Sequence, residues 1–415
     1  MQSARVWKRL LGVEHTVVDH VLYDDEEEDG VLVARVRPTR SRRGRCGLCL
    51  RRCPGYDQGN GRRRWRTLDL GVVQAFLEAE APRVRCRQHG VVAAAVPWAR
   101  HGAGFTRAFE DTAAWLATHT SRVAVAELLR VAWRSVGRMC ARVAAEQATK
   151  VDLLEGLRRI GIDEISYKKG QRYLTVVVDH DRGRLVWAAP GACEATLERF
   201  FDTLGEARCA EVELVSADAA EWIAAVVARR CPAAVRCADP FHVVKWATDA
   251  LDQVRREVWN TARKGGDTAV ARELKGARFA LWKNPEDLTR RQRGKLARIA
   301  QVNQRLYRAY LLKEELRLVF KVKGPRAVAL LDAWLVWARR CRIPAFVALA
   351  RSVTAYRNTI VASLLHGASN ARVESVNTRL RLLARIAFGF KSPQALIGLA
   401  MLALGGLCPQ LPGRA

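Results

Sequence analysis

The sequence predicts an α/β protein with a mixed β-sheet at its centre, a long helical segment inserted into that centre, and two small modules before it. Three observations lead to this prediction. Short apolar strands alternate with amphipathic helices from residue 157 to 241, no strand pattern recurs from 245 to about 360, and two Cys/His pairs precede residue 90. We therefore expect five segments: a zinc-knuckle module over 1–100, a helix-turn-helix over 101–150, the first part of the core over 151–245, an all-helical insertion over 246–360, and a C-terminal helical part of the core over 361–415.

The charge of the chain is strongly positive. Its 415 residues include 70 Lys and Arg against 42 Asp and Glu, which gives a formal net charge of +28. A chain of this charge is expected to bind a polyanion such as nucleic acid. The longest apolar run, residues 395–407, is too short to span a bilayer, and the N-terminus lacks the apolar stretch of a signal peptide. We therefore expect a cytoplasmic protein without a membrane partner.

The first 100 residues combine short alternating segments, such as 31–36 and 72–81, with two Cys/His pairs. The pairs are Cys46-Gly-Leu-Cys49 and Cys86-Arg-Gln-His89. Together they offer the four ligands of a tetrahedral structural zinc site, and Cys53 is a spare thiol that could substitute for one of them. The alternative is a set of reduced cysteines without metal.

Residues 104–148 have helical periodicity. Ser121 is a suitable cap for a second helix, and the break in the apolar pattern over 131–134 suits a helix-turn-helix. The last helix carries three arginines four residues apart on one face, which could bind phosphates or base edges: Arg134, Arg138 and Arg142. A helix whose arginines only face solvent fits this segment equally well.

The next segment predicts three consecutive antiparallel strands followed by a βαβ alternation. The strands are expected over 160–165, 173–178 and 185–189, and the helix, strand, helix and strand that follow over 195–204, 212–217, 220–229 and 234–237. This order is that of a ribonuclease H-like core. The helical insertion then contains five tryptophans expected to anchor its packing: Trp246, Trp259, Trp282, Trp334 and Trp337.

Three acidic residues are candidates to hold divalent metal. Asp163 and Asp218 each follow an apolar strand, and ligands gather where such strands end. Glu374 begins a helix after Asn370 whose polar side also carries Thr378 and two candidate DNA-binding residues, Arg381 and Arg385. Carboxylates in this arrangement can hold two hard cations for phosphoryl transfer. The alternative is that the aspartates cap turns and that Glu374 complements the helix dipole.

Asp239 complicates the choice of the second aspartate. It also follows a strand, and His242 lies one helical turn beyond it. This pair could ligate metal, support the metal ligands or hold a DNA end. Asp239 could equally cap the helix that begins at Pro240.

In combination these motifs resemble the DDE transposases of bacterial insertion sequences, of the ISL-three type. The resemblance covers nearly the whole chain, through the Cys/His pairs, the helix-turn-helix, and the blocks Gly-Ile-Asp-Glu (161–164), Asp-Pro-Phe-His (239–242) and Ser-Asn-x-x-Val-Glu-x-x-Asn (369–377). His89 stands where the family usually has Cys. The catalytic triad positions of the family align with Asp163, Asp218 and Glu374.

The resemblance implies a DNA transposase that binds the terminal inverted repeats of its element. It also implies Mg²⁺ or Mn²⁺ at the triad, cleavage at the element's end, attack of the freed 3′-hydroxyl on target DNA, a nucleoid-associated location in a bacterium, and at least a dimer in the synaptic complex. Two other functions stay open: a ribonuclease H-like nuclease without strand transfer, and a non-catalytic DNA-binding regulator derived from a transposase.

Overall fold

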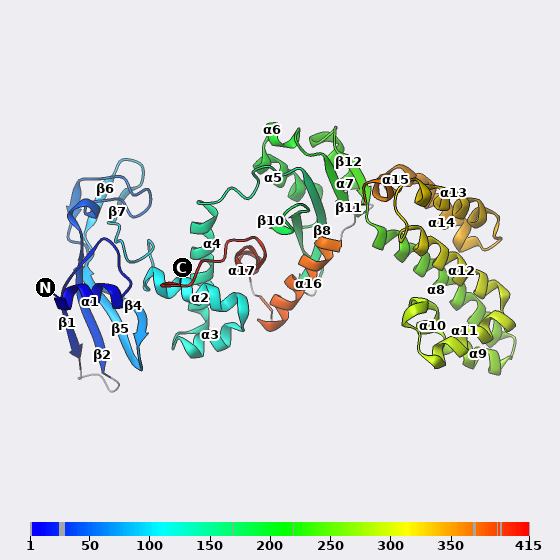
Figure 1. Cartoon of the computed structure of the whole chain (residues 1–415), viewed down its shortest axis with the longest axis horizontal. Helices are drawn as coiled ribbons and strands as arrows, with labels where there is room; N and C mark the ends of the chain where they lie inside the picture. Colours follow the sequence, from blue (N-terminus) through cyan, green and yellow to red (C-terminus); the bar gives the residue numbers. More distant parts are fainter. Residues whose placement is uncertain are drawn as a thin grey trace. The chain divides into compact units, whose positions relative to one another are not determined.

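The chain folds into two compact units. The computed structural model describes residues 2–24, 30–168, 170–218, 220–367, 371–387, 389–390 and 392–414 (Figure 1). The first unit comprises Met1–Leu153 and Arg379–Ala415, and the second comprises Leu154–Thr378.

The first unit begins with helix α1 (Gln2–Leu10) and a four-stranded sheet. The sheet has the order β1-β2-β5-β4, with strands β1 (Thr16–Asp24), β2 (Val31–Pro38), β4 (Arg62–Leu70) and β5 (Val73–Glu80). β2 and β5 run parallel, and the two outer pairs are antiparallel. Trp65 packs edge-on against Trp98 at 5.6 Å between ring centroids in the core behind this sheet. The strands predicted at 31–36 and 72–81 are confirmed as β2 and β5.

A smaller antiparallel sheet carries the second Cys/His pair, and the first pair precedes it, with Cys46 in an isolated bridge to Ala94. It consists of β3 (Gly55–Asp57), β6 (Arg83–Cys86) and β7 (Gly90–Ala93), and a short 3-10 turn, η1 (Arg40–Arg42), precedes it. The second pair lies on the hairpin between β6 and β7, so local strand pairing sets its geometry.

The helices of the first unit are α2 (Arg107–His119), α3 (Arg122–Leu128), α4 (Trp133–Ala148) and α17 (Pro393–Leu404). The Ser121 hydroxyl accepts a hydrogen bond from the backbone N–H of Ala124 at 3.1 Å, so the predicted cap of the second helix is confirmed. The predicted break falls between α3 and α4. α17 packs against α2 and α4, so much of the apolar run 395–407 is buried in the core of this unit. None of the described helices combines the length and the apolar character that a membrane crossing would need.

The second unit contains a five-stranded mixed sheet in the order β10-β9-β8-β11-β12. Its strands are β8 (Arg159–Lys168), β9 (Arg172–Asp179), β10 (Arg184–Pro190), β11 (Leu214–Ala217) and β12 (Val235–Ala238), and its helices are α5 (Glu194–Leu204), α6 (Glu206–Cys209) and α7 (Glu221–Arg230). The first three strands are antiparallel, and β8, β11 and β12 run parallel. The predicted order of strands and helices is confirmed.

Helices follow β12 without a further strand among the described residues of 240–366. They are α8 (Pro240–Lys264), α9 (Thr268–Lys275), α10 (Arg278–Trp282), η2 (Pro285–Asp287), α11 (Arg290–Val302), α12 (Gln304–Val319), α13 (Pro325–Arg340), α14 (Pro344–Ala355) and α15 (Arg357–His366) (Figure 1). Trp334 lies in their core and donates to the carbonyl of Leu312 at 2.8 Å. Trp246, Trp259 and Trp282 pack against the same core, but Trp337 is 36% exposed, so the prediction that it anchors packing is wrong.

The start of helix α16 (Ala371–Ile386) packs directly on strand β8. A Cβ atom built on Gly161 would lie 2.3 Å from Cγ2 of Val373 and 2.8 Å from Nε2 of His180. Only a residue without a side chain lets both groups approach β8 this closely. Ser369 and Asn370, which precede the helix in the sequence motif, lie outside the described residues.

Candidate active site and metal centre

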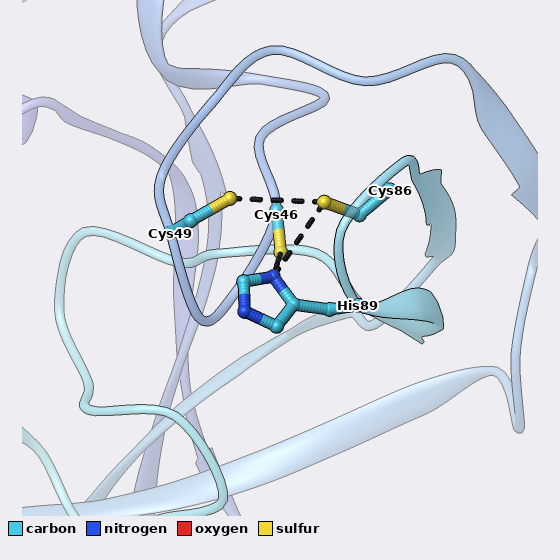
Figure 2. A group of neighbouring side chains, drawn as sticks. All are labelled: Cys46, Cys49, Cys86 and His89. Atoms are coloured by element: carbon cyan, nitrogen blue, oxygen red, sulfur yellow. Dashed lines mark hydrogen bonds between the residues drawn. The ribbon is translucent and has the colours of Figure 1, made fainter.

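The four predicted zinc ligands gather at one point in the first unit. Ligand atoms of Cys46, Cys49, Cys86 and His89 all lie within 4.8 Å of one another (Figure 2). Cys46 and Cys86 are buried, and the other two are half-buried. Cys53 is not in this group, and its thiol donates to the carbonyl of Arg51 at 3.4 Å.

The distances within the group fit a tetrahedral zinc ion. The sulfur atoms of Cys49 and Cys86 are 3.7 Å apart, and Nδ1 of His89 lies 3.6 Å from the sulfur of Cys46 and 3.6 Å from that of Cys86. Zn–S bonds of about 2.3 Å and Zn–N bonds of about 2.0 Å at tetrahedral angles give edges of about 3.8 Å between sulfurs and about 3.5 Å between sulfur and nitrogen. Hydrogen bonds from the backbone N–H groups of Gln88 and His89 lower the pKa of Cys86 to about 6, which favours the thiolate that zinc requires. The residues present therefore fit structural zinc.

In the second unit, three aspartates lie at one level of three neighbouring parallel strands. Gly161 of β8 pairs with Ser216 of β11, and Ala217 of β11 pairs with Ala238 of β12. Continuing these registers by one or two residues places Asp163, Asp218 and Asp239 side by side. The strand order thus brings together carboxylates that are far apart in the sequence.

Asp218 and Asp239 share one histidine. Nδ1 of His242 lies 2.6 Å from Oδ1 of Asp218 and 2.9 Å from Oδ2 of Asp239. The other oxygen of Asp239 accepts a hydrogen bond from the backbone N–H of Phe241 at 3.2 Å, so the predicted cap of α8 is confirmed. Asp239 is only 4% exposed, with both oxygens engaged, whereas the Asp218 side chain is 30% exposed.

The electrostatics of this site differ from those of an ordinary surface cluster. Burial raises the pKa of Asp163 to about 6; the negative charges of Asp218 and Asp239 act in the same direction, while the N–H of Glu164 and the charge of His242 oppose it. Hydrogen bonds to Asp218 and Asp239 raise the pKa of His242 to about 10, against the effect of its burial. Among the ion pairs of the described residues, none joins these three aspartates to an arginine or lysine.

Helix α16 contacts Asp163 directly. The side-chain amide of Asn377 donates to Oδ2 of Asp163 at 2.6 Å, and Asn377 is 1% exposed. Val373 lies over Gly161 and Asn377 lies over Asp163. The rise of four helical residues, about 6 Å, nearly equals that of two strand residues, about 6.6 Å, so the helix can follow the strand over this distance. Glu374 is half-buried and precedes Asn377 by three residues, so the two side chains are neighbours on the helix surface. This packing brings the start of α16 to the aspartates.

Two polar residues of this site were not among the sequence-based candidates. They are Asn377 and Glu164, a partly buried acid next to Asp163 whose pKa is raised chiefly by burial and also by the charge of Asp218. A polar amide among the apolar residues Val373, Val376 and Leu380 is the signal that could have identified Asn377.

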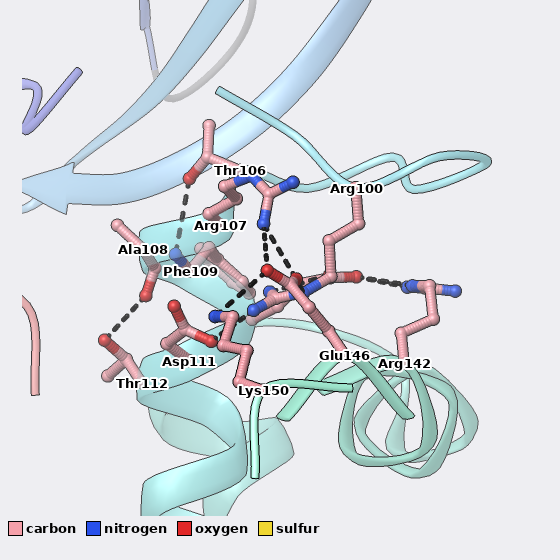
Figure 3. A network of polar contacts seen from close by, with 11 residues as sticks. Arg100, Thr106, Arg107, Ala108, Phe109, Asp111, Thr112, Arg142, Glu146 and Lys150 are labelled. Carbon is pink, nitrogen blue, oxygen red and sulfur yellow. Dashed lines mark hydrogen bonds and ion pairs between the residues drawn. The ribbon is translucent and has the colours of Figure 1, made fainter. Parts of the chain in front are cut away.

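The arginines of α4 divide into two kinds. Arg134 and Arg138 are exposed. Arg142 instead donates to the fully buried Glu110 at 2.8 Å, within a network that also holds Arg100 and Glu146 (Figure 3). The guanidinium of Arg142 is therefore engaged within the unit, by a buried carboxylate. Arg381 and Arg385 of α16 are exposed.

Comparison with known proteins identifies all three modules. A transposase family profile (ISL3 type) matches residues 160–399, the helix-turn-helix domain of transposase family ISL3 matches 94–144, and the zinc finger of the transposases of IS204, IS1001, IS1096 and IS1165 matches 42–89. These matches place the chain among the transposases, a class of nucleic-acid-processing enzymes.

Two kinds of relative extend this result. The chain is 57% identical to the transposase for insertion sequence element IS1557 of Mycobacterium tuberculosis, over 100% of this chain and 98% of that protein, in each of two strains. It is 27% identical to the transposase for insertion sequence element IS1001 of Bordetella parapertussis, over 84% of this chain and 86% of that protein. The chain therefore belongs to the ISL3 family of insertion-sequence transposases.

Proposed function

We propose that this transposase binds the terminal inverted repeats of its insertion sequence and catalyses metal-dependent DNA cleavage and strand transfer with Asp163, Asp218 and Glu374 as its catalytic residues. The strand order β10-β9-β8-β11-β12 supports a ribonuclease H-like core, with α8–α15 as a helical insertion before α16. The observation that carries the proposal is the convergence of the Asp163–Asn377 contact and the Asp218–His242–Asp239 cluster on one edge of this sheet.

The three carboxylates are suited to hold Mg²⁺ or Mn²⁺. Hard divalent cations prefer oxygen ligands, and ion-pairing arginines or lysines that would compete for Asp163 and Asp218 are absent from the described residues. When bound, such ions activate the attacking oxygen and stabilise the leaving oxygen in phosphoryl transfer. The side-chain amide of Asn377 orients Asp163 for this role.

Asp239 and His242 act by holding Asp218 rather than by binding metal themselves. Both oxygens of Asp239 are occupied, one by the start of α8 and one by His242, and His242 in turn contacts Asp218. This chain of contacts supports Asp218 as the second catalytic aspartate, with Asp239 and His242 as positioning residues.

DNA recognition is assigned to the zinc module and the helix-turn-helix of the first unit. Arg134 and Arg138 are exposed on α4, one turn apart, where guanidinium groups can reach phosphates or base edges. Arg381 and Arg385 of α16 would contact DNA phosphates. Synapsis of two ends requires at least a dimer.

The test is a cleavage and strand-transfer assay with Mg²⁺ or Mn²⁺ and a labelled duplex that carries the element's terminal repeat. We expect a 3′-hydroxyl at the repeat boundary and joining of that end to a second, unlabelled duplex. Asp163→Asn and Glu374→Gln should abolish both products while leaving binding of the duplex unchanged.

The same assay separates the two competing functions. Cutting without joining would support a nuclease of the same core. Binding of the repeat by wild-type protein without any cutting would support a non-catalytic regulator and contradict the proposal.

A further inference from the structure

The outer face of strand β6 in the zinc module carries a row of arginines. Arg83 and Arg85 are exposed, whereas Val84 and Cys86 between and after them are 2% and 4% exposed. Since side chains alternate across a strand, the two arginines project from the same face, about 6.6 Å apart along it. Arg87 follows as the next exposed position.

A tyrosine holds two of these guanidinium groups. The Cζ atoms of Arg83 and Arg85 lie 5.5 Å and 5.1 Å from the ring centroid of Tyr56 on the neighbouring strand β3. Cation–π contacts of this kind attract the guanidinium without neutralising its charge. The ring of Tyr56 thus lies beside both guanidinium groups at the exposed face of the module.

The acids around this face neutralise only one of the arginines. Asp57 accepts a hydrogen bond from Nε of Arg83 at 2.8 Å and forms an ion pair with the same guanidinium. Residues 44–57 and 83–93 contain Arg45, Arg51, Arg52, Arg83, Arg85 and Arg87 but only this acid. Among the described residues no ion pair neutralises Arg85 or Arg87. Adjacent like charges repel one another, so an anionic partner would relieve the unbalanced charge.

We propose that Arg85 and Arg87 bind phosphates of a DNA duplex independently of base sequence, and that Asp57 withholds Arg83 from the same contact. This inference rests on the proposed DNA transposase function and assigns a separate backbone-binding surface to the zinc module. Phosphate contacts fix the position of a protein on DNA without carrying sequence information.

The test compares two labelled duplexes, one carrying the terminal repeat and one of unrelated sequence, over a series of salt concentrations. The logarithm of the association constant falls linearly with the logarithm of the salt concentration, and removing one phosphate contact makes this fall shallower by about 1. Arg85→Gln/Arg87→Gln should therefore make the slope shallower by about 2 on both duplexes. Arg37→Gln/Arg158→Gln is a control that removes the same charge from exposed arginines paired with Asp19 and Glu213, and it should leave the slope unchanged.

A second variant tests the role of Asp57 by a gain of binding. Asp57→Asn removes the negative charge that neutralises Arg83, while the amide oxygen can still accept the hydrogen bond from Gly59 that Asp57 accepts at 2.8 Å. We expect tighter binding of both duplexes and a slope that is steeper by about 1.

Zinc content, measured for each variant, shows whether the module has kept its fold. An unchanged slope in zinc-loaded Arg85→Gln/Arg87→Gln would overturn the proposal, as would a loss confined to the terminal-repeat duplex, because that loss would indicate base reading. If the double variant loses zinc, an unchanged slope for Asp57→Asn overturns the proposal and a steeper one supports it. Since these measurements need no cleavage, a chain that binds with the expected slopes but does not cut would contradict only the proposed transposase chemistry.

Discussion

Each unit contains a cluster of carboxylates, and the two clusters differ in the side chains that pair with them. In the first unit, Glu110 and Glu146 are surrounded by cations from Arg100, Arg107 and Arg142 (Figure 3). In the second unit, the aspartates around Asp163 have one shared histidine and no arginine or lysine among the ion pairs of the described residues.

The pKa values follow from this difference. Burial alone would raise the pKa of Glu146, but the charges of Arg100 and Arg107 outweigh it and lower the pKa to about 2. Burial and neighbouring aspartates instead raise the pKa of Asp163 to about 6. Carboxylates that are already paired with arginines stabilise the fold, whereas carboxylates without a cationic side chain nearby can bind a metal cation. Four predictions test this contrast.

The largest expected effect is the loss of catalysis in Asp218→Asn. The substitution keeps the size of the side chain and removes the charge that would hold a divalent cation. We expect the rate of single-turnover DNA cleavage to fall by about 10³-fold, the order found when one group that stabilises a transition state is removed. Affinity for the terminal-repeat duplex should stay within about twofold, and an active Asp218→Asn would refute the assignment.

A smaller loss is expected for Asp239→Asn. The amide can still cap α8 but no longer attracts His242 with a full charge, so Asp218 is held less firmly. Residues that support metal ligands typically change activity by about 10–100-fold. The same assay compares the cleavage rates of the two variants. A larger loss in Asp239→Asn than in Asp218→Asn would reverse the roles assigned to the two aspartates.

The third prediction concerns the contact that brings α16 to the aspartates. Gly161→Ala places a methyl group against Val373 and His180, and overpacking of this kind costs about 1–3 kcal/mol. We expect cleavage to fall by roughly tenfold, a factor that corresponds to about 1.4 kcal/mol.

Val373→Ala should partly restore activity to Gly161→Ala because it removes the nearest of the clashing atoms. The double variant and both single variants are compared by cleavage rate and thermal melting. Additive losses in the double variant would show that Gly161 does not act through Val373.

The smallest expected effect on catalysis comes from Glu146→Gln. Because the folded pKa of Glu146 is about 2 and its ordinary value is 4.5, its ion pairs stabilise the fold fully above about pH 5 and are lost as the pH falls toward 2. Glu146→Gln should melt lower than wild type at pH 7, and the two melting temperatures should converge as the medium is acidified. Cleavage at neutral pH should be nearly unchanged, and a constant difference in melting temperature across this range would contradict the prediction.

The sequence predicted those features of the structure that are determined by residues close together in the chain. The succession of strands and helices along the second unit, the cap at Ser121 and the four zinc ligands all follow from spacing or periodicity within short segments. The four-stranded sheet of the first unit was not predicted in this form, since its parallel β2–β5 pair joins strands separated by two other strands along the chain.

The candidate active site was only partly predictable for the same reason. Asp163, Asp218 and Asp239 were candidates because each comes after apolar residues of a predicted strand; the structure places Asp218 and Asp239 directly after β11 and β12, but Asp163 within β8. The apolar neighbours of Asn377 mark it as a polar residue on a buried helix face, but its contact with Asp163 spans 214 residues of sequence, so no local pattern names this partner. Arg142 shows the converse case, because helical spacing gave it the same face as Arg134 and Arg138 but not its buried partner Glu110.

The close approach at Gly161 also has a genetic consequence. Any change in the first or second base of a glycine codon either adds a side chain or ends the protein, so this position offers many single-step routes to a less active copy of the element. We expect such a copy to encode a chain that still occupies the terminal repeats, and its co-expression with the wild type should lower transposition frequency. A spontaneous point mutation in one copy of the insertion sequence would thereby inhibit transposition of the other copies in the same cell.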